Sequence, residues 1–120
     1  MTERKEFYRQ LKSFLRELVV VFPESDDDLL TITTSINLAI IDDDCNELIY
    51  KFYNSLQPVN DEIHNRNTLI FDKINWEKTT YEYQLFEKLK NRWSTFTQND
   101  KTVIWDYIQV LYGLSTLVVR

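Results

Sequence analysis

Few side chains in this sequence could carry out nucleophilic or acid–base chemistry. His64 is the only histidine and Cys45 the only cysteine. A catalytic Cys–His pair needs both side chains in contact and a third group that orients the imidazole, and no motif here joins them. One histidine and one cysteine also cannot fill the usual ligand set of a zinc site. We therefore expect structural roles for both residues, with no metal site.

Acidic side chains form two runs, because residues 26–28 and 42–44 are all aspartates. Calcium-binding EF-hand loops place oxygen ligands at alternate positions and have a glycine at the turn, and neither run provides this pattern. Carboxylates also stabilise the positive end of a helix dipole, so we interpret both runs as helix N-termini. A catalytic interpretation requires the second run to meet Asp61, Glu62 and His64 in one pocket.

Glycine and proline are scarce, with one glycine and two prolines in 120 residues. Phosphate-binding loops and dinucleotide fingerprints need several glycines, so neither can occur. Hairpins also depend on glycine where φ is positive. The sequence therefore predicts a single all-α domain covering residues 1–120, with no cofactor and no enzymatic activity.

Apolar residues recur every three or four positions in five segments, as in amphipathic helices. We expect a bundle of about five helices, with Thr80 and Thr97 capping the last two. A short turn is predicted to begin at Asn60 or Asp61. Residues 67–80 are predicted to form an ordered connector whose large side chains enter the core. A short strand pairing within this connector is the alternative. The helical segments are residues 3–22, 25–41, 42–58, 80–93 and 97–119.

The last segment, residues 102–119, is apolar on almost every side. Its polar interruptions fall three or four positions apart, on one line of a helix: Asp106, Gln109, Gly113 and Thr116. A helix with so little polar surface must be enclosed by neighbouring helices, by a partner chain or by both. We expect it to be the central helix of the domain.

One flank of this last helix is predicted to form a protein interface. Trp105 and Tyr112 share a face, and both residue types are enriched at interface centres. Gly113 either lets a neighbouring backbone approach closely or weakens the helix. The core side is then expected at Tyr107, Ile108, Leu111 and Leu114. The predicted function is protein–protein interaction or assembly, with a partner protein or a second copy and no small-molecule substrate.

The first helix carries a basic stripe opposite its apolar face, formed by Lys5, Arg9, Lys12 and Arg16. The stripe could be a solvated face, a contact for nucleic acid or an acidic protein, or an anchor on an anionic membrane. Three more cations could extend it, namely Lys88, Lys90 and Arg92. A net charge of −5 disfavours contacts with phosphate groups, so nucleic-acid binding ranks second, after protein–protein interaction.

No uninterrupted apolar run reaches the roughly 18–20 residues that cross a bilayer, because Asp106 and Gln109 interrupt the last segment. Residues 1–16 alternate charged with apolar side chains and do not resemble a signal peptide. A single cysteine is typical of a reducing compartment. We expect a cytoplasmic protein without a membrane span.

Scattered aromatic and proline positions give the chain a family resemblance. The positions are Phe22-Pro23, Phe52 to Pro58 leading into Ile63 and Phe71, and Trp93…Lys101-x₂-Ile104-Trp105-x-Tyr107-x-Gln109-x-Leu111. This pattern resembles small uncharacterised helical proteins of nucleocytoplasmic large DNA viruses that infect amoebae and algae. The resemblance implies an all-helical product with no assigned catalytic residues, made in host cytoplasm and packaged in the virion. Asp106 departs from the basic residue common there, which puts a shared charge contact in doubt.

Overall fold

The computed structural model of the chain describes residues 2–22, 27–41, 46–73 and 80–119. These residues form helices and turns but no strand, so the all-α prediction is confirmed and the connector contains no strand pairing within this part. The five predicted helices correspond to the five long ones, and two short α-helices and two 3₁₀ helices lie between them. The elements are α1 (Thr2–Val21), α2 (Asp27–Ile41), α3 (Glu47–Leu56), η1 (Gln57–Val59), α4 (Asn60–His64), α5 (Ile70–Lys73), α6 (Tyr81–Arg92), η2 (Trp93–Thr95) and α7 (Gln98–Val119).

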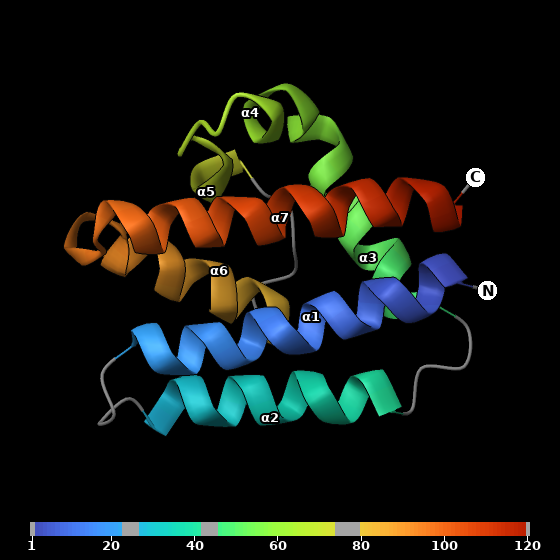
Figure 1. Cartoon of the computed structure of the whole chain (residues 1–120), viewed down its shortest axis with the longest axis horizontal. Helices are drawn as coiled ribbons and strands as arrows, with labels where there is room; N and C mark the ends of the chain where they lie inside the picture. The colour runs from blue at the N-terminus through green and yellow to red at the C-terminus, as the bar shows by residue number, and fades with distance from the viewer. Residues whose placement is uncertain (1, 23–26, 42–45, 74–79, 120) are drawn as a thin grey trace.

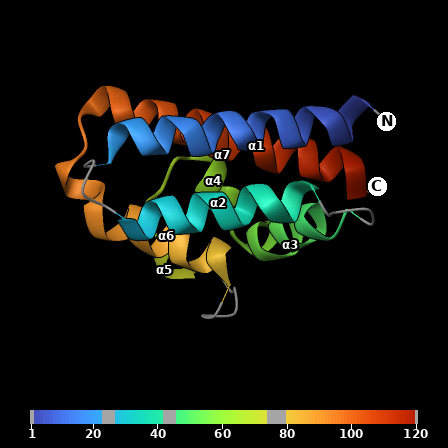
Figure 2. The same cartoon turned by 90° about the horizontal axis from the view of Figure 1, so that it is seen from below.

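The last helix, α7, is the centre of the bundle, as predicted. It packs against α1 along much of its length and also against α3 and α4. In Figure 1, α4 and α5 lie on one side of α7, while α1, α6 and α2 lie on the other. Figure 2 shows the same bundle from below, with α1 and α7 side by side and antiparallel. The helix is therefore covered on two sides by its own chain.

The apolar stripe of α1 forms the middle of the core. Phe7, Leu11, Phe14 and Leu18 are all at most 1% exposed, which confirms the predicted face. Phe14 also stacks on Tyr107 of α7, with ring centroids 5.2 Å apart. The helix ends at Val21, as expected from a proline at position 23, which disfavours helical geometry in the residue before it.

The second helix buries one face and exposes several apolar side chains on the outer face. Leu29, Ile32, Ile36 and Ile40 are buried, as the spacing predicts. The outward face carries exposed apolar residues, among them Leu30, Leu38 and Ile41. The aspartates proposed as caps for α2 and α3 at positions 26 and 42–44 lie outside the described residues, as does Cys45.

Threonine caps begin the last two long helices. The side-chain oxygen of Thr80 accepts from the Tyr83 N–H at 3.2 Å, and that of Thr97 accepts from the Asp100 N–H at 3.1 Å. Both caps satisfy amide groups that have no partner inside the helix. The two capping predictions are confirmed.

The connector between α4 and α6 places large side chains against the core, as predicted for the part that the structure describes. Ile70 is fully buried, and Phe71 packs its ring against Phe86, Trp93 and Trp105. The connector residues 74–79 lie outside the described residues.

Candidate protein interface

Trp105 belongs to the core of the chain. Its side chain is 5% exposed, and its ring lies 5.8 Å from Trp93 and 6.2 Å from Phe71, measured between centroids. The prediction had assigned Trp105 to a flank that faces a partner chain. In the described conformation its indole has almost no surface left for such a partner.

The two aromatic residues share a face of α7 but meet different neighbours. Near Trp105, that face is covered by Phe71 of α5 and by Trp93 of η2. Tyr112 instead contacts Tyr53 of α3, and its side chain is half-buried. Helical spacing predicts which residues share a face of α7. Which of them are buried depends on the other segments of the chain that pack against that face.

Tyr112 stacks on Tyr53 with near-parallel rings, whose centroids are 6.3 Å apart at an angle of 12°. Burial raises the pKa of the Tyr112 hydroxyl above its ordinary value of 10.0, and the nearby Tyr53 adds to that rise. A half-buried tyrosine pair of this kind offers both apolar ring area and a hydroxyl at the surface. Tyr112, one of the predicted interface residues, therefore has ring area and a hydroxyl group that a partner could contact.

Gly113 has open space beside it. A Cβ atom added there would meet no other heavy atom within 4 Å, and the residue is exposed. Among the residues that the structure describes, then, no neighbouring helix uses the close approach that a glycine allows. The exposed residues Val110 and Leu117 lie on the same line of α7 as Gly113, one turn before and one after.

A hollow of about 490 Å³ opens between α4 and the C-terminal half of α7. The described residues of its walls are mostly neutral and polar, and none of them has a carboxylate, ammonium or guanidinium group. The lining residues are Asn60, Ile63, His64, Gln109, Tyr112, Gly113 and Thr116. We give the name Gly113 surface to the exposed and half-buried residues Asn60, His64, Tyr112, Gly113 and Thr116. Two of the three predicted interface residues, Tyr112 and Gly113, belong to it.

The polar line predicted on α7 faces the segment that contains α4. Arg66 forms an ion pair with Asp106 and donates to Oε1 of Gln109 at 2.9 Å. Gln109 donates in turn to the carbonyl oxygen of Ile63 at 3.0 Å and to that of His64 at 3.4 Å. The polar residues of α7 thus hold the end of α4, which forms one wall of the hollow. The spacing predicts the line but not Arg66, which has no helical relation to α7.

The basic stripe lies on the outer face of α1, as its spacing predicts. All four residues, Lys5, Arg9, Lys12 and Arg16, are exposed. Arg9 pairs with Glu6, which holds the pKa of the Glu6 carboxyl at about 2, and a hydrogen bond from Gln10 contributes. In the expected extension of the stripe by Lys88, Lys90 and Arg92, the charge of Lys90 is partly neutralised by an ion pair with Asp72 on α5.

The acidic residues near His64 do not gather into a pocket with it. Asp61 is exposed, and Glu62 forms an ion pair with Lys73 at 2.8 Å, which lowers its pKa. His64 lines the hollow without either carboxylate. Within the described part of the chain, no group of three or more histidine, cysteine, aspartate or glutamate side chains could hold a metal ion.

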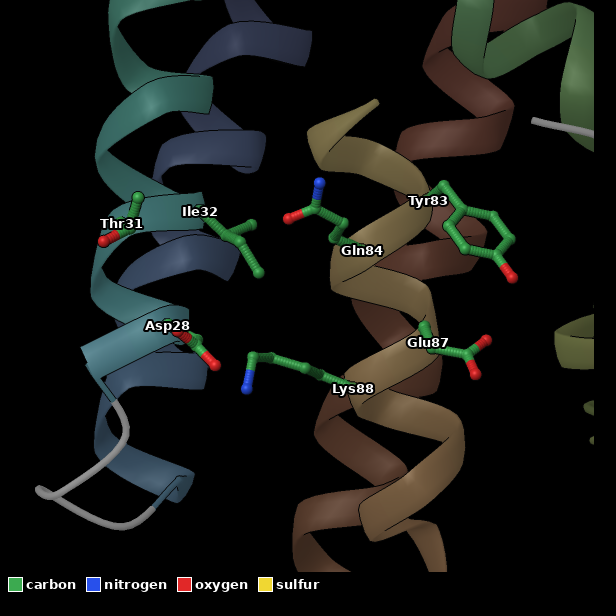
Figure 3. Close-up of a pocket in the computed structure, with 7 residues that line it drawn as sticks. All are labelled: Asp28, Thr31, Ile32, Tyr83, Gln84, Glu87 and Lys88. Carbon is green, nitrogen blue, oxygen red and sulfur yellow. The ribbon is translucent and has the colours of Figure 1, made fainter. Parts of the chain in front are cut away.

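A second hollow, of about 390 Å³, lies between α2 and α6 (Figure 3). Asp28 of α2 and Lys88 of α6 point toward one another across it, and Gln84 points toward α2. Tyr83 and Glu87, which also line it, point away from α2. No residue of either interface prediction lies in this hollow, although Lys88 belongs to the expected extension of the basic stripe.

By length and composition, α7 is also able to cross a membrane. This differs from the expectation from sequence, because Asp106 and Gln109 interrupt the apolar run but leave the helix with few charged residues. The core helix of a soluble protein meets it too, and α7 packs against α1, α3 and α4 within this fold.

The sequence matches no protein-family model, and comparisons with curated proteins and with solved structures found no match either. The resemblance to giant-virus proteins therefore stays a prediction. The geometry of the described residues alone carries the functional argument below.

Proposed function

We propose that this chain is a non-enzymatic interaction module that binds a partner protein through the Gly113 surface. The observation that carries the proposal is the open space beside Gly113 inside a hollow whose walls include the ring of Tyr112. A partner's side chain can approach the backbone of Gly113 there, because no heavy atom lies within 4 Å of the position of an added Cβ atom.

The chemistry of the surface supports a protein partner. Half-buried tyrosine rings contribute strongly to interfaces, since they bury a large area at little cost in conformational entropy. Val110 and Leu117, which are 43% and 42% exposed, extend the Gly113 surface with apolar area along α7. Among the described residues that line the hollow, His64 has no carboxylate beside it.

The virus resemblance adds a biological setting to the proposal. In that setting the chain is made in host cytoplasm and uses the Gly113 surface in an assembly step or in the virion. The partner is then another viral protein or a second copy of the chain.

A substitution at Gly113 tests the proposal. Gly113→Gln fills the open space with a side chain that favours helix, so we expect the fold to be retained and partner capture to fall. The matched control is Thr34→Gln, an exposed position on α2 at a distance from the hollow. Affinity capture from infected or expressing cells, with light scattering on the purified chain for self-association, measures both forms of binding. Equal capture by Gly113→Gln and by the unsubstituted chain would contradict the proposal.

The second candidate function is nucleic-acid binding by α1. It is favoured by the exposure of all four basic stripe residues along one face of the helix. Binding of this kind weakens steeply as salt rises, because phosphate contacts release counterions. A gel-shift titration of labelled DNA and RNA at low salt tests it, with Lys5→Gln and Lys12→Gln combined as the variant.

A further inference from the structure

Residues 57–73, which contain η1, α4 and α5, form a separate layer across α7, and we call them the strap (Figure 1). Val59, Ile63 and Ile70 are its buried residues, and Phe71 is half-buried. The remaining strap side chains are exposed or partly exposed. The strap is thus anchored by far less apolar area than α1, whose whole inner face is buried.

Ion pairs complete the attachment of the strap. Arg66 pairs with Asp106 on α7, and Asp72 pairs with Lys90 on α6 at 2.7 Å. Within the strap, Lys73 pairs with Glu62 at 2.8 Å and so joins α5 to α4. Between 36% and 59% of each side chain in the two outer pairs is exposed, so dissolved salt reaches them.

The end of α4 carries backbone strain at Arg66. Arg66 has a φ of 53°, a left-handed conformation that costs free energy in any residue with a Cβ atom. The N–H of Asn67 bonds to the carbonyl of Glu62 at 2.8 Å, and that of Arg66 bonds to Ile63 at 3.2 Å, as in a Schellman cap. Most such caps have glycine at this position. The strain therefore lowers the stability of this end of the strap.

The strap covers an aromatic cluster. The ring of Phe71 lies 5.1 Å from that of Trp93 and 6.3 Å from that of Phe86, between centroids, and it also covers Trp105. Departure of the strap would expose these rings on α6, η2 and α7. Trp105 could meet a second chain only in that open form.

From these contacts we infer that the strap opens as one unit while α1, α2, α3, α6 and α7 stay folded, and that ionic strength sets how often it opens. Segments with few buried apolar contacts open locally at lower free energy than the core. Salt screens the two outer ion pairs and shifts the equilibrium toward the open form. The inference does not depend on the Gly113 surface or on any partner.

Thiol labelling measures this opening directly. In a chain with Cys45 replaced by serine, Ile70→Cys places a thiol in a fully buried strap position, and Leu89→Cys places the matched thiol in α6. We expect the thiol at position 70 to be labelled faster than that at position 89 and with little dependence on denaturant. Raising sodium chloride should speed labelling at position 70 about two- to fivefold, because salt weakens both exposed outer ion pairs and each contributes little.

A charge variant tests the role of the ion pairs. Arg66→Gln should speed labelling at position 70 at low salt and reduce its salt dependence, whereas Lys51→Gln should not, because Lys51 pairs with Glu47 on α3. If Ile70→Cys does not fold, hydrogen exchange on the unsubstituted chain replaces it, comparing the amides of Asn67 and Phe71 with that of Ile108. Equal opening of strap and core, or an opening rate at the strap that salt leaves unchanged, would overturn the inference.

Discussion

The guanidinium group of Arg66 forms an ion pair with the carboxylate of Asp106, two residues that lie far apart in the sequence. Through this contact and the neighbouring bonds of Gln109, the end of α4 is fixed on the polar line of α7. The same contact orients one wall of the hollow that contains Gly113. The first two residues of the polar line predicted on α7, Asp106 and Gln109, therefore bind the end of α4.

The strain at Arg66 predicts an unusual order of stability among its variants. Arg66→Ala loses the contacts with Asp106 and Gln109 but keeps the left-handed backbone, so unfolding should become easier by about 1 kcal/mol. Arg66→Gly loses the same contacts but adopts positive φ without a Cβ, which recovers about 1 kcal/mol. Urea denaturation of both variants measures the difference. A glycine variant less stable than the alanine variant would contradict the strain.

Gly113 should be a site where stability can be gained. Gly113→Ala places a methyl group in open space and reduces the freedom of the unfolded chain, so the free energy of unfolding should rise by about 0.5–1 kcal/mol. Thermal denaturation followed by circular dichroism measures this rise. A drop in stability would show that the space beside Gly113 is filled in solution.

Trp105 and Tyr112 should differ sharply when truncated. Trp105→Ala removes a buried indole from the cluster with Trp93 and should cost about 3–5 kcal/mol, which is a large part of the stability of a domain this size. Tyr112→Phe keeps the ring on Tyr53 and loses only the hydroxyl group. Its loss of unfolding free energy should therefore be much smaller than that of Trp105→Ala. Chemical denaturation compares them, and similar losses would contradict the burial of Trp105.

The carboxyl group of Glu6 should titrate far below ordinary glutamate. Its pKa is lowered from 4.5 to about 2 by hydrogen bonds from Arg9 and Gln10. A lowered folded-state pKa adds stability that is complete above pH 4.5 and is lost as the pH falls from there toward 2. Carbon-detected NMR titration of the carboxyl resonance measures the midpoint. In Arg9→Gln the midpoint should move back toward 4.5, and an unchanged midpoint would exclude Arg9 as the cause.

Much of the fold follows from local sequence signals. The spacing of Phe7, Leu11, Phe14 and Leu18 predicts the buried face of α1, and Thr80 and Thr97 predict the starts of α6 and α7. These signals act within a few residues, so they can be interpreted without knowing how the chain folds back on itself.

The candidate site was harder to predict because it depends on contacts between distant segments. The burial of Trp105 depends on Phe71, whose segment has no helical period. Likewise, Arg66 pairs with Asp106 only because α4 crosses α7. The positive φ of Arg66 could not be predicted from the sequence either, because arginine is not typical of that conformation. Tyr112 and Gly113 could be selected from spacing and residue type, but the hollow that joins them to His64 could not.

The most direct test of the proposed interaction surface is an NMR map of the amides that change when the chain binds. The captured partner, or a concentration series if the chain self-associates, is added to isotopically labelled protein. We predict shifts or line broadening at residues 60–64 and 109–117, with the amides of residues 5–16 unchanged. Changes confined to residues 5–16 instead would contradict the Gly113 surface and favour the basic stripe of α1.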